Sequence, residues 1–384
     1  MINEQTNQCN KSIKLCFVAL SAYPLLSGRN LGHIIGPDVH TLLLARELIK
    51  HNFEITFITY DEGGPPIEHI NGIEIIKTYR LRDIDRLNPL SKAFRIWKAM
   101  RKVKADIYFH HGGAAGVGSL FCRWMNRRFV CHIGSDVLVN TNLITSKIKE
   151  FSRSKFSIGT FGNWLDIKFA DVVIVQNEYQ VIMLKENFGK DGVLIKKLFP
   201  LTKRGMPEKA KPPVVLWVGA MAEVKQPELF LKLAEAIPET RFQMIGGYSP
   251  GNQQLYEKLK ESSKRVPNFE YLGVIAFDQI NEYFSRASIL VNTSIFEAYP
   301  PYAAIQAWIN YTPVVSLGDN PDEIICRYDM GFHSKTFEQL VRHVRILLEN
   351  EHLRKRMGEN GRGYVEKEHD ITEIVERYLE LFNH

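Results

Sequence analysis

The chain has few cysteines, and none of them forms a pattern of paired thiols. Its five cysteines are Cys9, Cys16, Cys122, Cys131 and Cys326, an odd number without any Cys-x-x-Cys pair. This spacing favours neither a disulfide framework nor a zinc site. Reduced thiols fit a cytoplasmic protein, because disulfides persist mainly in oxidising compartments. We therefore predict a cytoplasmic location.

Long apolar runs are also absent, and none reaches the length of a membrane-spanning helix. Near the N-terminus, Lys11 and Lys14 precede an apolar run over residues 15–20, as in a short signal peptide. Ser21 and Pro24 interrupt this run, and no small-x-small cleavage site followed by a new domain start is visible. We interpret the run as the first strand of a domain.

Charge of one sign does not dominate either. The 384 residues are 45% hydrophobic and 24% charged, with a net charge of +6. This composition is typical of a globular protein, and the length is too great for one ordinary domain. A modest positive charge suits phosphate-bearing ligands without demanding nucleic acid, so we predict no nucleic-acid partner.

Acidic clusters suited to a metal ion are scarce as well. Asp83 and Asp85 have the spacing of a pair that holds a metal-bound diphosphate. Arg82 and Arg86 flank them in a polar connection, and the pattern often arises by accident. We predict no metal and no cofactor.

Apolar strand-like runs alternate with helical patterns along the chain. The predicted strands are residues 13–20, 54–60, 73–79, 106–110, 129–132, 171–176, 193–198, 214–218, 241–245, 269–272, 288–292 and 313–316. The predicted helices are residues 38–50, 91–104, 228–236, 253–263, 278–285, 302–309 and 371–384. Such alternation predicts parallel sheets covered on both faces, with too many strands for one compact sheet. We predict an α/β fold with two doubly wound domains.

A basic segment rich in proline, residues 199–213, separates the two halves and is typical of an exposed linker. We place one domain at residues 1–202 and the other at residues 203–370. The final segment, residues 371–384, predicts a helix with one apolar side that packs on either domain.

Unusual residues gather where parallel sheets bind ligands, beyond the carboxyl ends of strands. After the first strand come Gly28, Gly32 and Gly36, and then Pro37 opens a helix. Free backbone N–H groups at a helix start favour anions. We interpret this loop as an approach to phosphate or sugar, with a plain strand-to-helix connection as the alternative.

Two further strand ends in the first half differ in what they predict. The glycine-rich segment 112–119 lacks the lysine of a P-loop, and the Gly-x-Gly-x-x-Gly register fails at Phe121. It predicts an ordinary turn. His132 ends a strand and leads into Gly134, so it is a ligand candidate that faces a cleft, although a single histidine is usually structural.

In the second half, Gly219 follows a strand and Lys225 precedes Pro227, which opens the next helix. A cation at a helix N-terminus opposes the macrodipole. Either Lys225 is solvated on a loop, or it shares an anion such as a diphosphate with the helix end.

Glu297 follows another strand end, and Gln306 lies in the next helix. These side chains are suited to bind hydroxyl groups while helix N–H groups bind phosphate. The alternative is that Glu297 only caps the helix.

These segments resemble the family 4 glycosyltransferases, which have the GT-B fold of two Rossmann-like domains that face a deep cleft. The resemblance extends from about residue 13 to the final helix. Residues 217–219 with Lys225 are similar to the V-G-R…K segment of that family. Residues 297–308 followed by 312–315 are similar to its E-G-F-G/P…E-A-M…T-P-V-V segment. Residues 36–40 are similar to G-G-A-E-V-H, and residues 132–136 to H-G-S-D.

The resemblance implies roles for individual residues. His132 would contact the transferring sugar, Glu297 its hydroxyl groups, and Lys225 the diphosphate; these three are the predicted catalytic residues. The predicted donor-binding residues are Gly36, Gly219, Ala220, Lys225, Glu297, Tyr302 and Gln306, with Gln306 at the ribose and Gly36 near the phosphates. The family is retaining and generally metal-independent, and its last helix, here residues 371–384, commonly crosses back to the N-terminal domain.

The chain departs from the family pattern at several positions. Ala220 stands in place of the arginine, and Gln306 in place of the second glutamate at a spacing one residue longer. Pro300 and Pro301 supply no N–H groups where the family often uses backbone donors. Either another basic group, for which Arg29 is our candidate, replaces the arginine, or the phosphate clamp is weakened.

We predict a glycosyltransferase that transfers a sugar from a nucleotide-diphosphate sugar to a glycan, lipid-linked or small-molecule acceptor, with retention. The alternatives are a catalytically impaired GT-B protein that binds nucleotide-sugar, and a sugar-nucleotide epimerase. The donor base, the sugar, the acceptor and the oligomeric state stay open.

The helix predicted over residues 91–104 has Ile96 and Met100 on one face, with Arg95 and Lys98 opposite. This pattern is typical of a helix that packs on a core and has one solvated side. The alternative is peripheral contact with the inner face of a membrane, to reach a lipid-linked acceptor.

Overall fold

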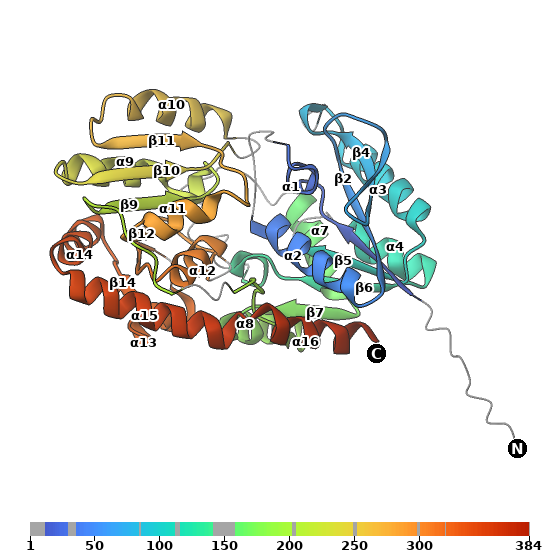
Figure 1. The fold of residues 1–384 in the computed structure, drawn as a ribbon. Helices are drawn as coiled ribbons and strands as arrows, with labels where there is room; N and C mark the ends of the chain where they lie inside the picture. Colours follow the sequence, from blue (N-terminus) through green and yellow to red (C-terminus); the bar gives the residue numbers. More distant parts are fainter. Residues whose placement is uncertain are drawn as a thin grey trace, which may run out of the picture.

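The structure is a computed structural model. It describes residues 12–29, 36–83, 86–111, 116–140, 158–201, 205–248, 252–297, 300–318 and 320–383. The described residues form two sheets side by side, each covered by helices on both faces (Figure 1). None of the described helices is both long and apolar enough to cross a membrane.

The N-terminal sheet has eight strands in the order β3-β4-β2-β1-β5-β6-β7-β8. Their bounds are β1 Ile13–Val18, β2 Phe53–Asp61, β3 Ile67–Ile70, β4 Ile73–Arg80, β5 Ile107–His111, β6 Arg128–His132, β7 Val172–Val175 and β8 Val193–Leu194. Neighbours are parallel except β3 and β4, which are antiparallel. The central strands are apolar on both faces because helices cover both sides.

Helices connect these strands. They are α1 Tyr23–Ser27, α2 Gly36–Lys50, α3 Pro89–Val103, α4 Val117–Met125, α7 Ile158–Phe169 and α8 Glu178–Phe188. Local sequence sets both ends of α3. At its start, the side chain of Asn88 accepts a hydrogen bond from the backbone N–H of Ser91, and Pro89 occupies the first turn. At its end, Lys104 has a left-handed backbone conformation that closes the helix. An N-cap of this kind is worth about 1 kcal/mol.

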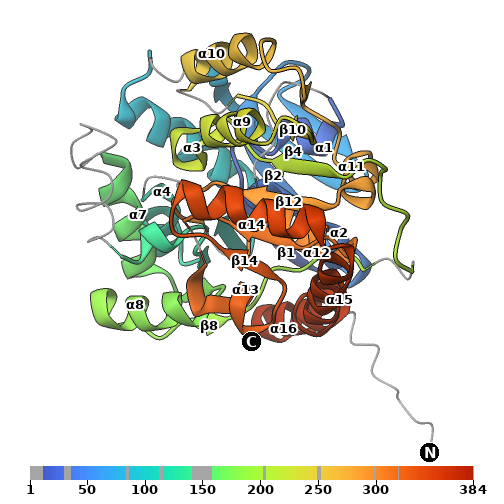
Figure 2. The same ribbon diagram turned by 90° about the vertical axis from the view of Figure 1, so that its left-hand side faces the viewer.

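The C-terminal sheet is fully parallel, with six strands in the order β11-β10-β9-β12-β13-β14. Figure 2 shows the molecule with this half facing the viewer. Its strands are β9 Val214–Val218, β10 Arg241–Ile245, β11 Phe269–Gly273, β12 Ile289–Asn292, β13 Val314–Ser316 and β14 Gly331–His333. Its helices are α9 Pro227–Ala236, α10 Gln253–Ser263, α11 Ile280–Arg286, α12 Tyr302–Ile309, α13 Ile324–Arg327, α14 Phe337–Glu349 and α15 Glu351–Glu368.

The chain crosses between the sheets twice. After β8 it leads into the C-terminal sheet, and after α15 it returns through α16, Ile371–Asn383, which packs against α2 (Figure 1). The two crossings are bonded to each other: the N–H of Phe199 donates to the carbonyl of His369 over 3.1 Å, and the His369 ring lies 2.7 Å from the carbonyl of Lys197. This ladder fixes Lys197 between the two sheets.

The predicted parallel α/β organisation is confirmed, and most predicted strands and helices begin and end within two residues of those observed. The strand predicted over residues 193–198 is wrong beyond Leu194. Ile195 and Leu198 are apolar because they are buried in the crossing between the sheets, not because they pair in a sheet. The edge strand β3 was not predicted, because its side chains alternate between exposed and partly exposed positions.

Candidate functional site

A cavity of about 360 Å³ lies where the carboxyl ends of both sheets meet. The predicted donor-binding residues lie far apart in the sequence but all line this one cavity: Gly36, Gly219, Ala220, Lys225, Glu297, Tyr302 and Gln306. His111, Gly134 and Lys197 line it from the N-terminal half and the crossing. The predicted roles of these residues stay predictions, but their convergence on one cavity is observed.

On the C-terminal wall, the loop after β9 is fastened to the loop after β12. The indole N–H of Trp217 donates to Thr293 Oγ1 over 2.9 Å, and Thr293 Oγ1 donates to the carbonyl of Lys225 over 2.6 Å. The N–H of Ile295 donates to the carbonyl of Val224 over 2.9 Å. These bonds place the two predicted ligands of the donor, one from each loop, next to each other.

Lys225 Nζ forms an ion pair with Glu297 Oε1, and Ser294 Oγ donates to the same carboxylate oxygen over 2.7 Å. Both charged side chains are mostly shielded, with 23% of Lys225 and 13% of Glu297 exposed. The hypothesis that Lys225 is merely solvated on a loop is therefore wrong, because a carboxylate holds its ammonium group at the cavity wall. Likewise, Glu297 pairs with a side chain and does not cap α12, which has no side-chain cap bond.

Gly246 brings the loops after β9 and β10 together, and the sequence analysis did not single it out. Its φ is +153°, and a Cβ at this position would lie 1.8 Å from the carbonyl oxygen of Gly219. A side chain at position 246 would therefore force the two loops apart. The signal was the pair Gly246 and Gly247 directly after a strand.

Two prolines stand directly before the start of helix α12 at the cavity. Pro300 and Pro301 precede Tyr302 and carry no N–H groups. Tyr302 and Gln306, one turn later, are both buried and line the cavity. The helix start therefore offers the N–H groups of its first turn, together with these two side chains, but no N–H group from the two residues before it.

On the N-terminal wall, α2 begins at Gly36 and its first turn lines the cavity. A Cβ at Gly36 would lie 3.7 Å from Tyr302 Cδ2, which is ordinary van der Waals contact. Steric space alone therefore does not demand glycine at this position. A close approach to a bound phosphate, the predicted role, would be a separate reason for it.

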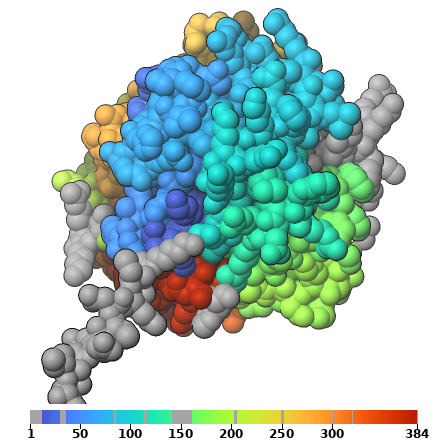
Figure 3. Space-filling view, turned by 90° about the vertical axis from the view of Figure 1, so that its right-hand side faces the viewer, coloured from blue at the N-terminus to red at the C-terminus, as the bar shows by residue number. Residues whose placement is uncertain are grey.

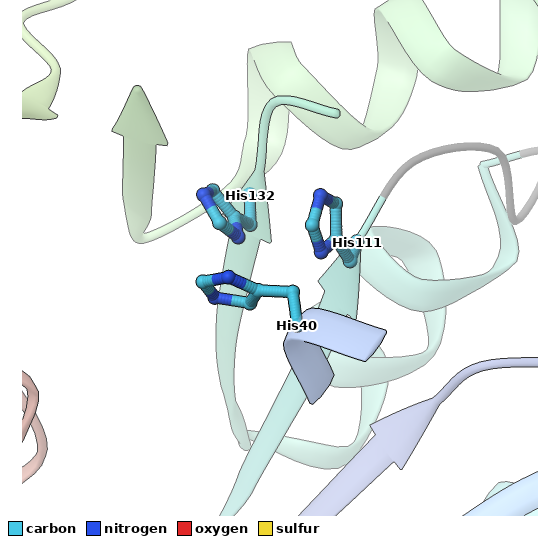
Figure 4. Close-up of side chains that lie close together, drawn as sticks. All are labelled: His40, His111 and His132. Atoms are coloured by element: carbon cyan, nitrogen blue, oxygen red, sulfur yellow. The ribbon is translucent and has the colours of Figure 1, made fainter. Parts of the chain in front are cut away.

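Three histidines form a cluster at this wall: His40, His111 and His132 (Figure 4). The ring centroids of His111 and His132 lie 4.2 Å apart, and those of His40 and His132 lie 4.5 Å apart. His132 is fully buried, and it is His111, its register partner on β5, that lines the cavity. The prediction that His132 faces the cleft is wrong for this conformation, because neighbouring rings enclose it. Its contact with the sugar stays a prediction.

Both ring nitrogens of His40 have partners. Nδ1 lies 2.9 Å from the hydroxyl of Tyr302 on α12, and Nε2 lies 3.0 Å from the hydroxyl of Tyr378 on α16. Burial and the Lys197 charge lower the pKa of His40 to about 3. Burial likewise lowers the pKa values of His111 and His132 well below the usual value, so the cluster is neutral.

The cluster also offers one nitrogen from each ring, all within 4.8 Å of one another, which is a spacing that could hold a metal ion. Binding there would cost His40 one of its tyrosine hydrogen bonds. Asp83 of the predicted acidic pair lies 4.0 Å from Arg86, and Asp85 lies outside the described residues. The absence of a metal stays a prediction.

Asp136 lies near this wall, four residues after His132, and is buried. Its Oδ1 accepts hydrogen bonds from Asn177 over 3.1 Å and from Gln180 over 2.7 Å. Burial raises the pKa of Asp136 to about 6, although both hydrogen bonds act in the opposite direction.

Lys197 was not among the predicted site residues. This residue is 7% exposed, lines the cavity and donates from Nζ to the carbonyl of Pro300 over 2.8 Å. Lys197 lies inside the strand predicted over residues 193–198, so its charge did not indicate a ligand site. Arg29, our candidate for the missing guanidinium, does not line the cavity; its guanidinium carbon lies 5.9 Å from the Tyr23 ring centroid.

Two family models match the chain. The model described as Glycosyltransferase Family 4 matches residues 35–195, and the model described as Glycosyl transferases group 1 matches residues 200–364. An uncharacterized glycosyltransferase of Methanocaldococcus jannaschii is 24% identical over 345 residues, which cover 87% of this chain and 91% of that protein.

Solved structures resemble the whole chain. The sucrose-phosphate synthase of Thermosynechococcus elongatus superposes with a TM-score of 0.77 at 16% identity, covering 97% of this chain and 98% of that one. Anabaena HepE, solved in complex with UDP-glucose, gives a TM-score of 0.72 at 14% identity, covering 97% and 99%. At such identities the likeness shows a shared fold.

Proposed function

We propose that this chain, which belongs to the family 4 glycosyltransferases and has their GT-B fold, takes its sugar from a nucleotide-diphosphate sugar bound in the cavity between its two sheets. The observation that carries the proposal is the convergence of both domains' predicted donor residues on one cavity of about 360 Å³. A related structure, Anabaena HepE, was solved with UDP-glucose, which supports a donor of this class.

The charges of the cavity support a bound diphosphate only when Lys197 is included. Among the described residues, Lys197, Lys225 and Glu297 are the charged side chains that line the cavity. Lys225 and Glu297 form an ion pair, so their charges cancel. Lys197 therefore supplies the net positive charge of the cavity lining.

Lys197 lies where it can replace hydrogen-bond donors that the family pattern has and this chain lacks. Its ammonium group bonds to the carbonyl of Pro300, at the start of α12, where two successive prolines carry no N–H group. Ala220, on the opposite loop, offers no guanidinium. We assign Lys197 as the cation that contacts the donor diphosphate and compensates for these losses.

In the proposed reaction, Lys197 and Lys225 stabilise the negative charge that builds on the leaving diphosphate. Glu297 accepts hydrogen bonds from hydroxyl groups of the transferring sugar, and Gln306 bonds the ribose. A neutral histidine can donate and accept, so His111, which lines the cavity, suits uncharged sugar hydroxyls. We also propose that the transfer retains the configuration of the sugar and that the acceptor is a carbohydrate or is lipid-linked.

Calorimetry with UDP, GDP and a panel of nucleotide-sugars tests the donor site, and mass spectrometry of reaction mixtures tests transfer. We expect one nucleotide to bind, and at 100 times its Kd to stabilise the fold by about 2.7 kcal/mol. We also expect turnover that EDTA does not change. No binding across the panel would refute the proposed function.

The same mixtures separate the two alternatives. Binding without any transferred sugar, over a broad acceptor panel, would favour a non-catalytic nucleotide-sugar-binding role. An altered donor sugar with no acceptor consumed would favour an epimerase.

A further inference from the structure

Exposed apolar side chains gather on three helices of the N-terminal half, α3, α4 and α7, where α4 packs against both of the others. Figure 3 shows α3 and α4 from cyan to teal on this side of the molecule. In the described part of the chain, eight of the thirteen exposed large apolar side chains lie on these helices: Leu90, Phe94, Leu120, Trp124, Met125, Phe161, Trp164 and Phe169. We call this surface the α3–α4–α7 face.

The exposure is largest at three side chains of α3 and α4. Leu90 is 82% exposed, Trp124 is 80% exposed and Phe94 is 67% exposed. Single apolar side chains are common on protein surfaces, but a group of them on adjacent helices is typical of an interaction site. The side chains that α3 buries instead are Ile96, Ala99 and Met100, so its core contacts leave Leu90 and Phe94 unused.

The charge of the face has one sign. Its exposed basic side chains are Arg95, Lys98, Arg101, Lys102, Arg123 and Lys168. The one acidic residue within the three helices, Asp166, is buried and accepts hydrogen bonds from the N–H groups of Gly116 and Ser119. The face therefore presents bulky apolar groups among positive charges, without exposed carboxylates from these helices.

We propose that the α3–α4–α7 face docks on the surface of a membrane that contains anionic lipid. Tryptophan and phenylalanine side chains insert favourably at the boundary between headgroups and acyl chains. Each lysine or arginine near an anionic bilayer contributes about 1 kcal/mol, or roughly fivefold in affinity.

Docking also has a consequence for the cavity. Helices that connect parallel strands run opposite to them, so α3, α4 and α7 begin at the carboxyl edge of the sheet. Leu90, Leu120 and Phe161 lie in the first turn or two of their helices, at the edge where the cavity opens. A lipid-linked acceptor could thus reach the donor from the bilayer; this link rests on the proposed function, whereas docking itself does not.

Cosedimentation tests the docking with vesicles of phosphatidylcholine alone and of phosphatidylcholine mixed with phosphatidylglycerol. We expect the full chain to bind the mixed vesicles at least about tenfold more tightly, and less tightly as salt rises. Arg95→Gln with Lys98→Gln should weaken binding to the mixed vesicles about 30-fold, or about 2 kcal/mol. Phe94→Ser with Trp124→Ser should weaken it about tenfold.

Matched controls lie on other faces. Lys258→Gln with Lys260→Gln removes two exposed charges from α10, and Ile182→Ser removes an apolar side chain, 53% exposed, from α8. Neither control should change vesicle binding. Circular dichroism and thermal unfolding should be unchanged in every variant, since all the altered side chains are exposed; if one pair fails to fold, the other pair still decides.

Three results would overturn the proposal. The first is equal binding, or none, to neutral and anionic vesicles. The second is an equal loss in the controls. The third is a lipid-free dimer, detected by analytical ultracentrifugation and abolished by Trp124→Ser, which would make the face a contact between copies of the chain. If the chain binds vesicles but no nucleotide, the docking proposal stands and the proposed function is rejected.

Discussion

The two walls of the cavity differ in the charge of their side chains. The C-terminal wall carries the ion pair of Lys225 and Glu297 on loops fastened by Thr293. The N-terminal wall is neutral: burial lowers the pKa values of His40, His111 and His132, so these rings carry no charge at physiological pH. The comparison teaches that the two walls are suited to different parts of a donor, charged on one side and rich in hydroxyl groups on the other.

Lys197 stands between these walls and belongs to neither. It lies on the crossing segment, where His369 holds its carbonyl and Pro300 accepts from its ammonium group. Its charge also contributes to the low pKa values of all three histidines. One residue therefore provides the net charge of the cavity and helps to keep the neutral wall neutral.

Breaking the ion pair should give the largest effect. We expect Lys225→Ala and Glu297→Ala each to lower turnover at least about a hundredfold, or about 2.7 kcal/mol of barrier. Their UDP affinities should differ, because Lys225→Ala leaves a carboxylate facing the diphosphate, whereas Glu297→Ala removes it. Calorimetry should show at least about tenfold weaker UDP binding for Lys225→Ala alone. Wild-type kinetics in either folded variant would remove that residue from the mechanism.

The stability of the fold near the neutral wall should respond to pH through the buried Asp136. Its folded pKa, about 6, is raised above the ordinary value of 3.8, so folding favours the protonated form. The destabilisation is therefore complete above pH 6 and is relieved as the pH falls towards 4. Between pH 7 and pH 4, wild type should gain roughly 2 kcal/mol of unfolding free energy relative to Asp136→Asn. Parallel pH profiles from denaturant titrations of the two proteins would contradict this.

The variant Lys197→Met tests whether Lys197, between the walls, contacts the diphosphate. We expect about tenfold weaker UDP binding, or about 1.4 kcal/mol, because the variant loses a charge-assisted contact. Uridine, which has no phosphate, should bind both proteins equally. The matched control is Lys196→Met, whose ammonium pairs with Glu368 outside the cavity. Equal losses for UDP and uridine would make Lys197 a structural residue only.

The smallest effect is expected at Ala220. If Lys197 already supplies the cation, Ala220→Arg should change turnover less than about tenfold, and like-charge crowding could make the change a decrease. A tenfold or greater increase would show instead that the phosphate clamp of the natural chain is weakened. Steady-state kinetics of the variant, and of Ala220→Arg combined with Lys197→Met, would separate these accounts.

Much of the fold follows from local pattern. Apolar runs such as residues 214–218 specify buried parallel strands, and Pro227 specifies the first turn of α9. Motif resemblance also located Gly219, Lys225 and Glu297, because the chemistry of a strand end depends on a few adjacent residues. Short pieces such as β14 carried too few residues to show a period, and the longer helices α14 and α15 were also not predicted.

The sequence by itself determined that this chain has two parallel α/β halves and which strand ends carry ligand-binding residue types, because burial and backbone preference act over short segments. Only the tertiary structure decided that Lys225 pairs with Glu297, that His111 and not His132 reaches the cavity, and that Lys197 charges it. These contacts join residues between 21 and 172 positions apart. They depend on how two sheets and two crossing segments meet, which no local pattern encodes.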